Sequence, residues 1–215
     1  MALNPVSPFP YQLFTQNGAG TACTGTTSAG NLLLASKAST TYGLPSLSPD
    51  YFPAAYGIAK TIKVWARGLI SLASAATPQT LVMGLYSNAA DSTASAAQWS
   101  GTTTLAATPT ITPQASNAVS NAVWTLDAEI TADSTGSAGA MQVLGCLTIA
   151  PTAAVTLGTV NATTPAQPIG LGGSATVALN TESTNYLGIG ATWGASNSSA
   201  SNTLTCYTVH IFALN

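Results

Sequence analysis

Charged side chains are scarce in this chain of 215 residues. It has four Lys and Arg and six Asp and Glu, so that 5% of its residues are charged, against about 25% in ordinary soluble domains. Four cationic side chains cannot neutralise a row of phosphates, which argues against a nucleic-acid partner. A net charge of −2 does little to keep copies of the chain apart, so we expect the protein to associate.

Groups that carry catalysis are equally few. One histidine, His210, and six carboxylates are available as acid, base or metal ligand, and neither a nucleophile elbow nor an HExxH motif occurs. His210 lies in an alternating apolar and polar run near the C-terminus, which favours a structural or interfacial role. The sequence therefore predicts a protein that is not an enzyme and that has no cofactor and no metal site.

Two carboxylates have a spacing that chemistry can use. Asp127 and Glu129 lie on one face of a candidate strand, as a pair of acid and base carboxylates would. Solvated or inter-subunit charges explain the same spacing. Cations that can face them across a neighbouring strand are Lys60, Lys63 and Arg67.

Paired cysteines and export signals are also absent. The three cysteines, Cys23, Cys146 and Cys206, have no CxxC spacing, and we expect buried free thiols. A disulfide between Cys146 and Cys206 is the alternative. The N-terminus has no basic n-region and no long apolar h-region, which predicts synthesis in the cytoplasm without a signal peptide.

A membrane span is not expected. No charge occurs between Asp133 and Glu182, but threonines and three prolines interrupt the apolar residues of this stretch. A spanning helix does not easily accommodate these prolines. The sequence thus predicts no membrane partner.

Alternation with a period of two residues recurs from residue 57 onward, and no window has a helical stripe bounded by caps. Candidate strands cover residues 58–71, 80–86, 123–132, 141–150, 186–193 and 204–214, with weaker candidates at 31–36, 152–160 and 174–179. Polar, turn-rich links separate them. This pattern predicts an all-β fold, an antiparallel β-sandwich of jelly-roll type, over residues 57–215.

Residues 1–56 differ from this body. Six of the twelve prolines lie in this segment, and we expect an extended N-terminal arm that proline and glycine keep from pairing into the sheet. Aromatic side chains are not left in water along a free linker, so we expect the arm to pack on its own body or on a neighbour. An N-terminal strand folded onto the same domain is the alternative. The expected anchors of the arm are Phe9, Tyr11, Phe14, Tyr51 and Phe52.

The four tryptophans admit two interpretations. They are Trp65, Trp99, Trp124 and Trp193. Tryptophans can line a sugar-binding face, or they can fill a core or a subunit interface. The second interpretation is the favoured one.

The C-terminal body resembles a known class of protein. The motifs that carry the resemblance are WTLDAEIT from Trp124, the GSAG turn, MQVLG from Met141 and YLGIGATWGASNSSASNTLTC from Tyr186. Over about residues 57–215 they resemble a β-sandwich domain of tailed-bacteriophage virion proteins. The resemblance implies a jelly-roll-like fold, commonly trimeric, that decorates capsids or occurs in tails and fibres, without catalytic residues.

The expected function is therefore structural. We expect a capsid decoration or cement protein on the outer head surface of a tailed-phage virion, which forms a homotrimer and contacts the major capsid protein or another virion protein. The arm anchors make the main contact. Alternatives are a tail or fibre component, a carbohydrate-binding adhesin module, and a hydrolase with His210 as its base.

Overall fold

The fold was analysed in a computed structural model. It describes residues 11–20, 22–24, 30–33, 45–49, 51–52, 60–73, 80–88, 103–111, 113–115, 119–150, 155–157, 168–172, 176–194 and 202–214. Within these ranges the regular elements are β-strands, and no helix long and apolar enough to cross a membrane is present. The expected all-β class is thus confirmed.

The larger of two antiparallel sheets has eight strands, in the order β1-β15-β5-β9-β10-β12, with β13 paired to β10 and β2 paired to β15. Its strands are β1 (Tyr11–Asn17), β2 (Cys23–Thr24), β5 (Thr61–Leu72), β9 (Val119–Ser134), β10 (Ala140–Ile149), β12 (Ile169–Gly170), β13 (Val177–Ala178) and β15 (Thr203–Ala213). The long strands β5, β9 and β15 form its centre.

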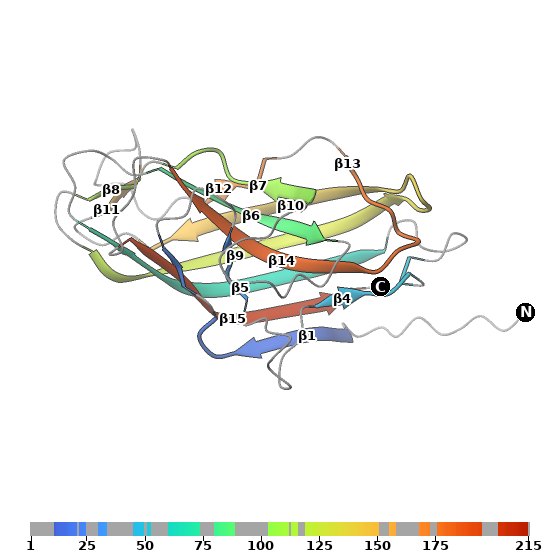
Figure 1. Cartoon of the computed structure of the whole chain (residues 1–215), viewed down its shortest axis with the longest axis horizontal. Coiled ribbons are helices and arrows are strands. Elements are labelled where there is room, and N and C mark those ends of the chain that lie inside the picture. Colours follow the sequence, from blue (N-terminus) through green and yellow to red (C-terminus); the bar gives the residue numbers. More distant parts are fainter. Residues whose placement is uncertain are drawn as a thin grey trace, which may run out of the picture.

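The smaller sheet has five strands, in the order β3-β14-β6-β7, with β4 paired to β14. Its strands are β3 (Gly30–Asn31), β4 (Ser46–Leu47), β6 (Leu81–Asn88), β7 (Thr103–Ala107) and β14 (Asn185–Trp193). A separate ribbon pairs β8 (Pro113–Ala115) with β11 (Val155–Leu157). In Figure 1 the small sheet forms one layer and the large sheet forms the other.

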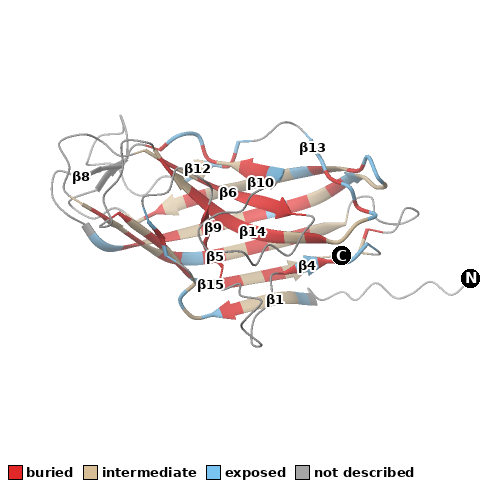
Figure 2. Cartoon of the chain, viewed as in Figure 1, coloured by how far each residue is buried: buried red, intermediate tan, exposed pale blue. Residues whose placement is uncertain are grey.

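The two layers enclose one apolar core, which makes the fold a β-sandwich. Buried and half-buried residues alternate along β5 and β9, seen as alternating red and tan bands in Figure 2. Side chains from both layers meet at the centre: Val64, Ile130, Val209 and Ile211 come from the large sheet, and Leu85, Leu105, Leu187 and Ile189 from the small one. Burial of each such side chain contributes about 1.5–3 kcal/mol.

Period-two alternation located the long strands correctly. Residues 123–132 form the centre of β9, and Trp124, Leu126 and Ile130 lie on its buried side. None of the expected strands covers β7, β8 or β12. The jelly-roll subtype stays a prediction, because the strand order establishes two antiparallel sheets without singling out that topology.

The expectation that the N-terminal arm stays out of the sheets is wrong. β1 and β2 pair with β15, and β3 and β4 pair with β14. The indole Nε1 of Trp193 also donates a hydrogen bond to the carbonyl oxygen of Cys23, at 3.2 Å. The physical reason is that no proline occurs between Pro10 and Pro45, so the backbone N–H groups of β1 to β3 remain available for pairing. The alternative of an N-terminal strand folded onto the same domain describes the structure better.

One close approach in the core depends on a glycine. Gly68 of β5 is paired with Trp124 of β9, and the indole ring lies against the glycine. A Cβ at Gly68 would lie 2.5 Å from this ring and would overlap the carbonyl oxygen of Thr205 in β15. Any larger residue must therefore displace either the tryptophan or a central strand.

We expect Gly68→Ala to lower the free energy of unfolding by about 1–3 kcal/mol, because the added methyl group overpacks the core. For a domain of this size that corresponds to a fall in Tm of about 2–10 °C. The matched control is Gly170→Ala, since a Cβ at Gly170 meets nothing within 4 Å. Thermal unfolding followed by circular dichroism measures both, and an unchanged Tm for Gly68→Ala would contradict the packing described.

Candidate interaction site on the outer face of the large sheet

The candidate site is the side of the large sheet that points away from the core, here called the outer face. Since successive side chains of a strand point to opposite sides, the residues that alternate with the core residues form this face. It consists of Thr61, Lys63, Trp65, Arg67 and Leu69 of β5, Val123, Thr125, Asp127, Glu129 and Thr131 of β9, Gln142, Leu144, Cys146 and Thr148 of β10, and Thr208, His210 and Phe212 of β15.

An aromatic stack lies at the centre of the outer face. The His210 ring lies between those of Trp65 and Phe212, with ring centroids 5.6 and 5.9 Å away and interplanar angles of 21° and 24°. A hydrogen bond of 3.1 Å joins His210 Nδ1 to Thr15 Oγ1 of β1. Three nearly parallel rings from two strands thus stack in a half-exposed row on the outer face.

A charged cluster adjoins the stack. Lys63 Nζ lies 3.1 Å from Asp127 Oδ1 and 3.8 Å from Glu129 Oε1, which confirms the interpretation that a cation on a neighbouring strand faces the two carboxylates. The hydrogen bond to Asp127 raises the pKa of Lys63 above its usual value. Both carboxylate side chains are 49% exposed. Surface ion pairs of this kind contribute little stability, about 0–1 kcal/mol.

Asp127 and His210 are not brought together in the fold. Asp127 is two strands away from His210, about 10 Å at the usual spacing of strands, so it cannot orient the imidazole. In the part of the chain that the structure describes, no group of three or more His, Cys, Asp and Glu is placed to hold a metal ion.

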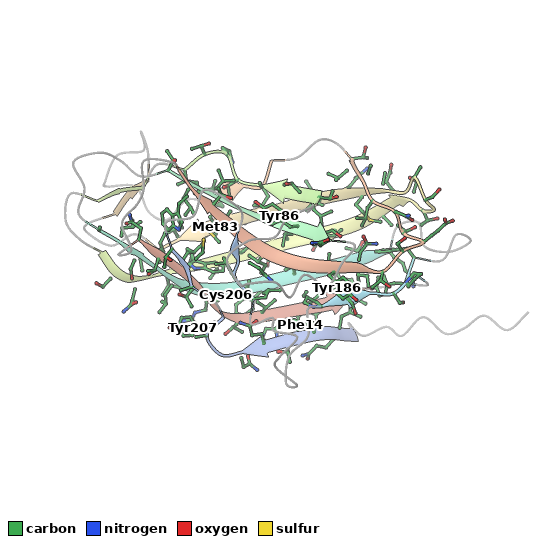
Figure 3. The ribbon with its side chains drawn as sticks, viewed as in Figure 1. Phe14, Met83, Tyr86, Tyr186, Cys206 and Tyr207 are labelled. Atoms are coloured by element: carbon green, nitrogen blue, oxygen red, sulfur yellow. The ribbon has the colours of Figure 1, made fainter. Side chains whose placement is uncertain are left out.

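Apolar side chains are exposed on the same sheet. Leu144 of β10 is 76% exposed and lies directly beside Glu129 on the outer face. Tyr207, at the bulge near the middle of β15, is 41% exposed (Figure 3). Exposed apolar groups beside half-exposed aromatic rings are typical of a surface that contacts another macromolecule.

The residues expected to anchor the arm divide into two groups. Phe9 and the side chain of Tyr11 lie outside the described residues. Phe14 of β1 is paired with Ile211 and packs against the core, beside β15 in Figure 3. Tyr51 and Phe52 form an edge-to-face pair with ring centroids 4.8 Å apart.

The pair formed by Tyr51 and Phe52 is held by its own body. Lys60 donates a hydrogen bond of 3.1 Å to the carbonyl oxygen of Tyr51, and its ammonium group lies 5.2 Å from the tyrosine ring. Burial raises the pKa of Tyr51 to about 12. Phe52 is 4% exposed, so its side chain belongs to the core and leaves little surface for a partner.

The tryptophans take different positions. Trp124 and Trp193 are buried in the core, and Trp65 lies on the outer face. Trp99 lies outside the described residues. The four tryptophans therefore do not form one sugar-binding face. A sugar-binding role would involve Trp65 together with His210 and Phe212.

The three cysteines are free thiols, as expected. Cys23 and Cys206 are buried, whereas Cys146 is half-buried on the outer face. The alternative of a disulfide between Cys146 and Cys206 is wrong, because β5 and β9 separate their strands. Burial raises the pKa of the Cys23 thiol to about 11 and that of the Cys206 thiol to about 12, from the ordinary value of 9.0.

Sequence reasoning missed the outer face as a unit. Alternation identified which residues of β5 and β9 share a side, but not which residues of neighbouring strands lie next to each other.

Comparisons with known proteins find no match among protein-family models, curated proteins or solved structures. The resemblance to tailed-phage virion proteins therefore rests on the sequence motifs.

The thiol environments generate a test. At pH 8 we expect no more than one equivalent of an aromatic disulfide reagent to react with the folded protein, at Cys146, and the Cys146→Ser variant to react with none. Unfolding in guanidinium should expose all three thiols. Reaction of two thiols in the folded protein would contradict the burial of Cys23 and Cys206.

The same thiols predict how stability depends on pH. Their pKa values are raised in the folded state, so the fold favours the neutral thiols. The stability they contribute is fully present below about pH 9 and is lost as the pH rises toward 11–12. Urea unfolding of Cys206→Ala and the parent should show a smaller loss above pH 9 in the variant.

Proposed function

We propose that this protein is a structural component of a tailed-phage virion, a decoration or cement protein that binds the outer surface of the head. The observation that carries the proposal is the outer face of the large sheet. It combines half-exposed aromatic rings, an exposed leucine and hydroxyl groups with four charges that sum to zero. Such a surface suits adhesion between proteins. The sequence resemblance to tailed-phage virion proteins is the reason for proposing a virion.

Self-association belongs to the same proposal. A near-neutral protein whose large sheet ends, among the described residues, at the edge strand β1 lowers its exposed area by pairing with copies of itself. In a homotrimer, which the sequence resemblance implies, every copy makes the same contacts with its neighbours. The virion is accordingly the proposed location, with assembly from protein made in the host cytoplasm.

Attachment to the head is proposed for the residues before and within β1. Phe9 and Tyr11 are the aromatic candidates there, followed by Phe14, whereas Phe52 is not retained because it is buried. One well-packed aromatic anchor contributes about 2 kcal/mol or more, and copies that bind together multiply the effect.

The binding test uses heads assembled without this protein. We expect the purified chain to co-sediment with such heads in a saturable manner, and removal of residues 1–10 to weaken binding about tenfold or more, which corresponds to about 1.4 kcal/mol. Glu182→Lys, a charge change in an exposed turn, is the control that should bind normally. Absence of binding to heads, with labelling of tails or fibres by an antibody, would favour the alternative of a tail component.

Carbohydrate binding is the second candidate, because Trp65 and Phe212, at the two ends of the stack around His210, are half-exposed aromatic rings of the kind on which sugar rings pack. If it is correct, the protein binds a glycan array and Trp65→Ala abolishes that binding, while Tyr207→Ala retains it. A protein that binds no glycan, or whose binding survives Trp65→Ala, excludes this role for the stack.

A further inference from the structure

We propose that a second copy of this chain docks on the outer face of the large sheet, through a two-fold axis that runs parallel to the strands between β5 and β9. The inference rests on the proposed self-association and names the surface that mediates it. Its basis is the order of side chains across the sheet, which is complementary to itself.

Antiparallel pairing aligns the outer-face residues of four neighbouring strands in rows. One row consists, in order across β15, β5, β9 and β10, of Phe212, Lys63, Glu129 and Leu144. Across the sheet, the row therefore begins with an apolar residue, continues with a cation and an anion, and ends with another apolar residue. Rotation about the proposed axis exchanges β5 with β9 and β15 with β10 while keeping each row at its level.

The rotation places opposite charges and apolar groups face to face. Lys63 comes to lie opposite the second copy's Glu129, and Glu129 opposite the second copy's Lys63. Leu144, which is 76% exposed in the single chain, comes to lie opposite the second copy's Phe212. A two-fold contact forms each of these pairs twice.

The rows farther along the strands are also compatible with this arrangement. Leu69 and Val123 are paired across β5 and β9, so the rotation sets Leu69 opposite the second copy's Val123. At the other end Thr61 and Thr131 are paired, and the rotation sets hydroxyl opposite hydroxyl. No row brings two like charges together.

The face approaches the size of a stable interface. β15, β5 and β9 run side by side from Ile62 to Ser71 of β5, roughly 33 Å by 14 Å, and β10 accompanies them as far as Gly68, which gives roughly 600 Å² of face per copy. A standard stable interface buries about 800 Å² per partner. Sheets that pack face to face keep their strands within about 30° of each other, which an axis nearly parallel to the strands permits.

The charges argue for a copy of the chain over other occupants. Lys63 and Arg67 lie on β5, and Asp127 and Glu129 lie on β9, so each face has two positive and two negative groups in adjacent columns. A partner of uniform charge would repel one of the two columns. The same face rotated by 180° sets the β5 column opposite the β9 column, with Lys63 opposite the second copy's Glu129 and Arg67 one row along from its Asp127.

The experiment measures mass in solution by light scattering, and it uses charge reversal. We expect an even number of copies for the full-length protein, which means twice the 21.4 kDa of one chain or, where a trimeric ring uses another surface, six copies. Lys63→Glu and Glu129→Lys each place like charges opposite one another and should halve the mass. Glu182→Lys, outside the outer face, should leave it unchanged.

Mixing the two variants separates a contact between copies from an effect within one chain. The K63E chain has carboxylates at both positions and the E129K chain has amines at both, so a mixed pair restores both contacts. We expect the equimolar mixture to regain the parental mass. In that mixture Cys146, which would lie opposite the second copy's His210, should react with thiol reagents several-fold more slowly than in either variant alone.

Two results would overturn the proposal. One is a parental mass that both single variants retain, whether it corresponds to one chain or to three. The other is a mass that both variants halve but that mixing does not restore. Neither result bears on attachment to heads, which the co-sedimentation assay measures separately, so failure of the two-fold contact and failure of the proposed function are distinguishable.

Discussion

The alternation of side chains across the large sheet is the constraint on which the rest of the structure depends. Ile62, Val64 and Ala66 of β5 enter the core, and the residues between them must point to the outer face. A slip of one residue in pairing would move every core residue into solvent. The requirement that the sheets bury their apolar residues therefore also fixes the composition and the register of the outer face.

This constraint brings several of the few charged side chains together on one face. Only ten of the residues in the chain are charged, and four of them lie together on two neighbouring strands, as Lys63, Arg67, Asp127 and Glu129. Beside them His210 lies between two aromatic rings. The concentration of charge and aromatic surface on one side of an otherwise neutral molecule is the reason that the contact between copies is proposed for this side.

The N-terminal segments complete both layers. β1 and β2 extend the large sheet beyond β15, while β3 and β4 pair along β14 in the small sheet. Backbone hydrogen bonds outside these short strands add to the pairing, among them Gly20 N to the carbonyl oxygen of Cys206 and Leu32 N to that of Ile189. Proline-rich flanks thus surround segments that pair as ordinary strands, and the division of the chain at residue 57 does not separate paired from unpaired backbone.

The sequence by itself determined the all-β class, the positions of the long strands and the sides on which Trp124 and Asp127 point, because a period of two residues is a local property that five or more residues reveal. It also named three cations that can face Asp127 and Glu129, of which Lys63 is the one that does. Only the tertiary structure decided that Phe212, Lys63, Glu129 and Leu144 form one row. Strand order and register arise from contacts between residues far apart in the chain, and strands of two residues, such as β3 and β12, are too short to show any period at all.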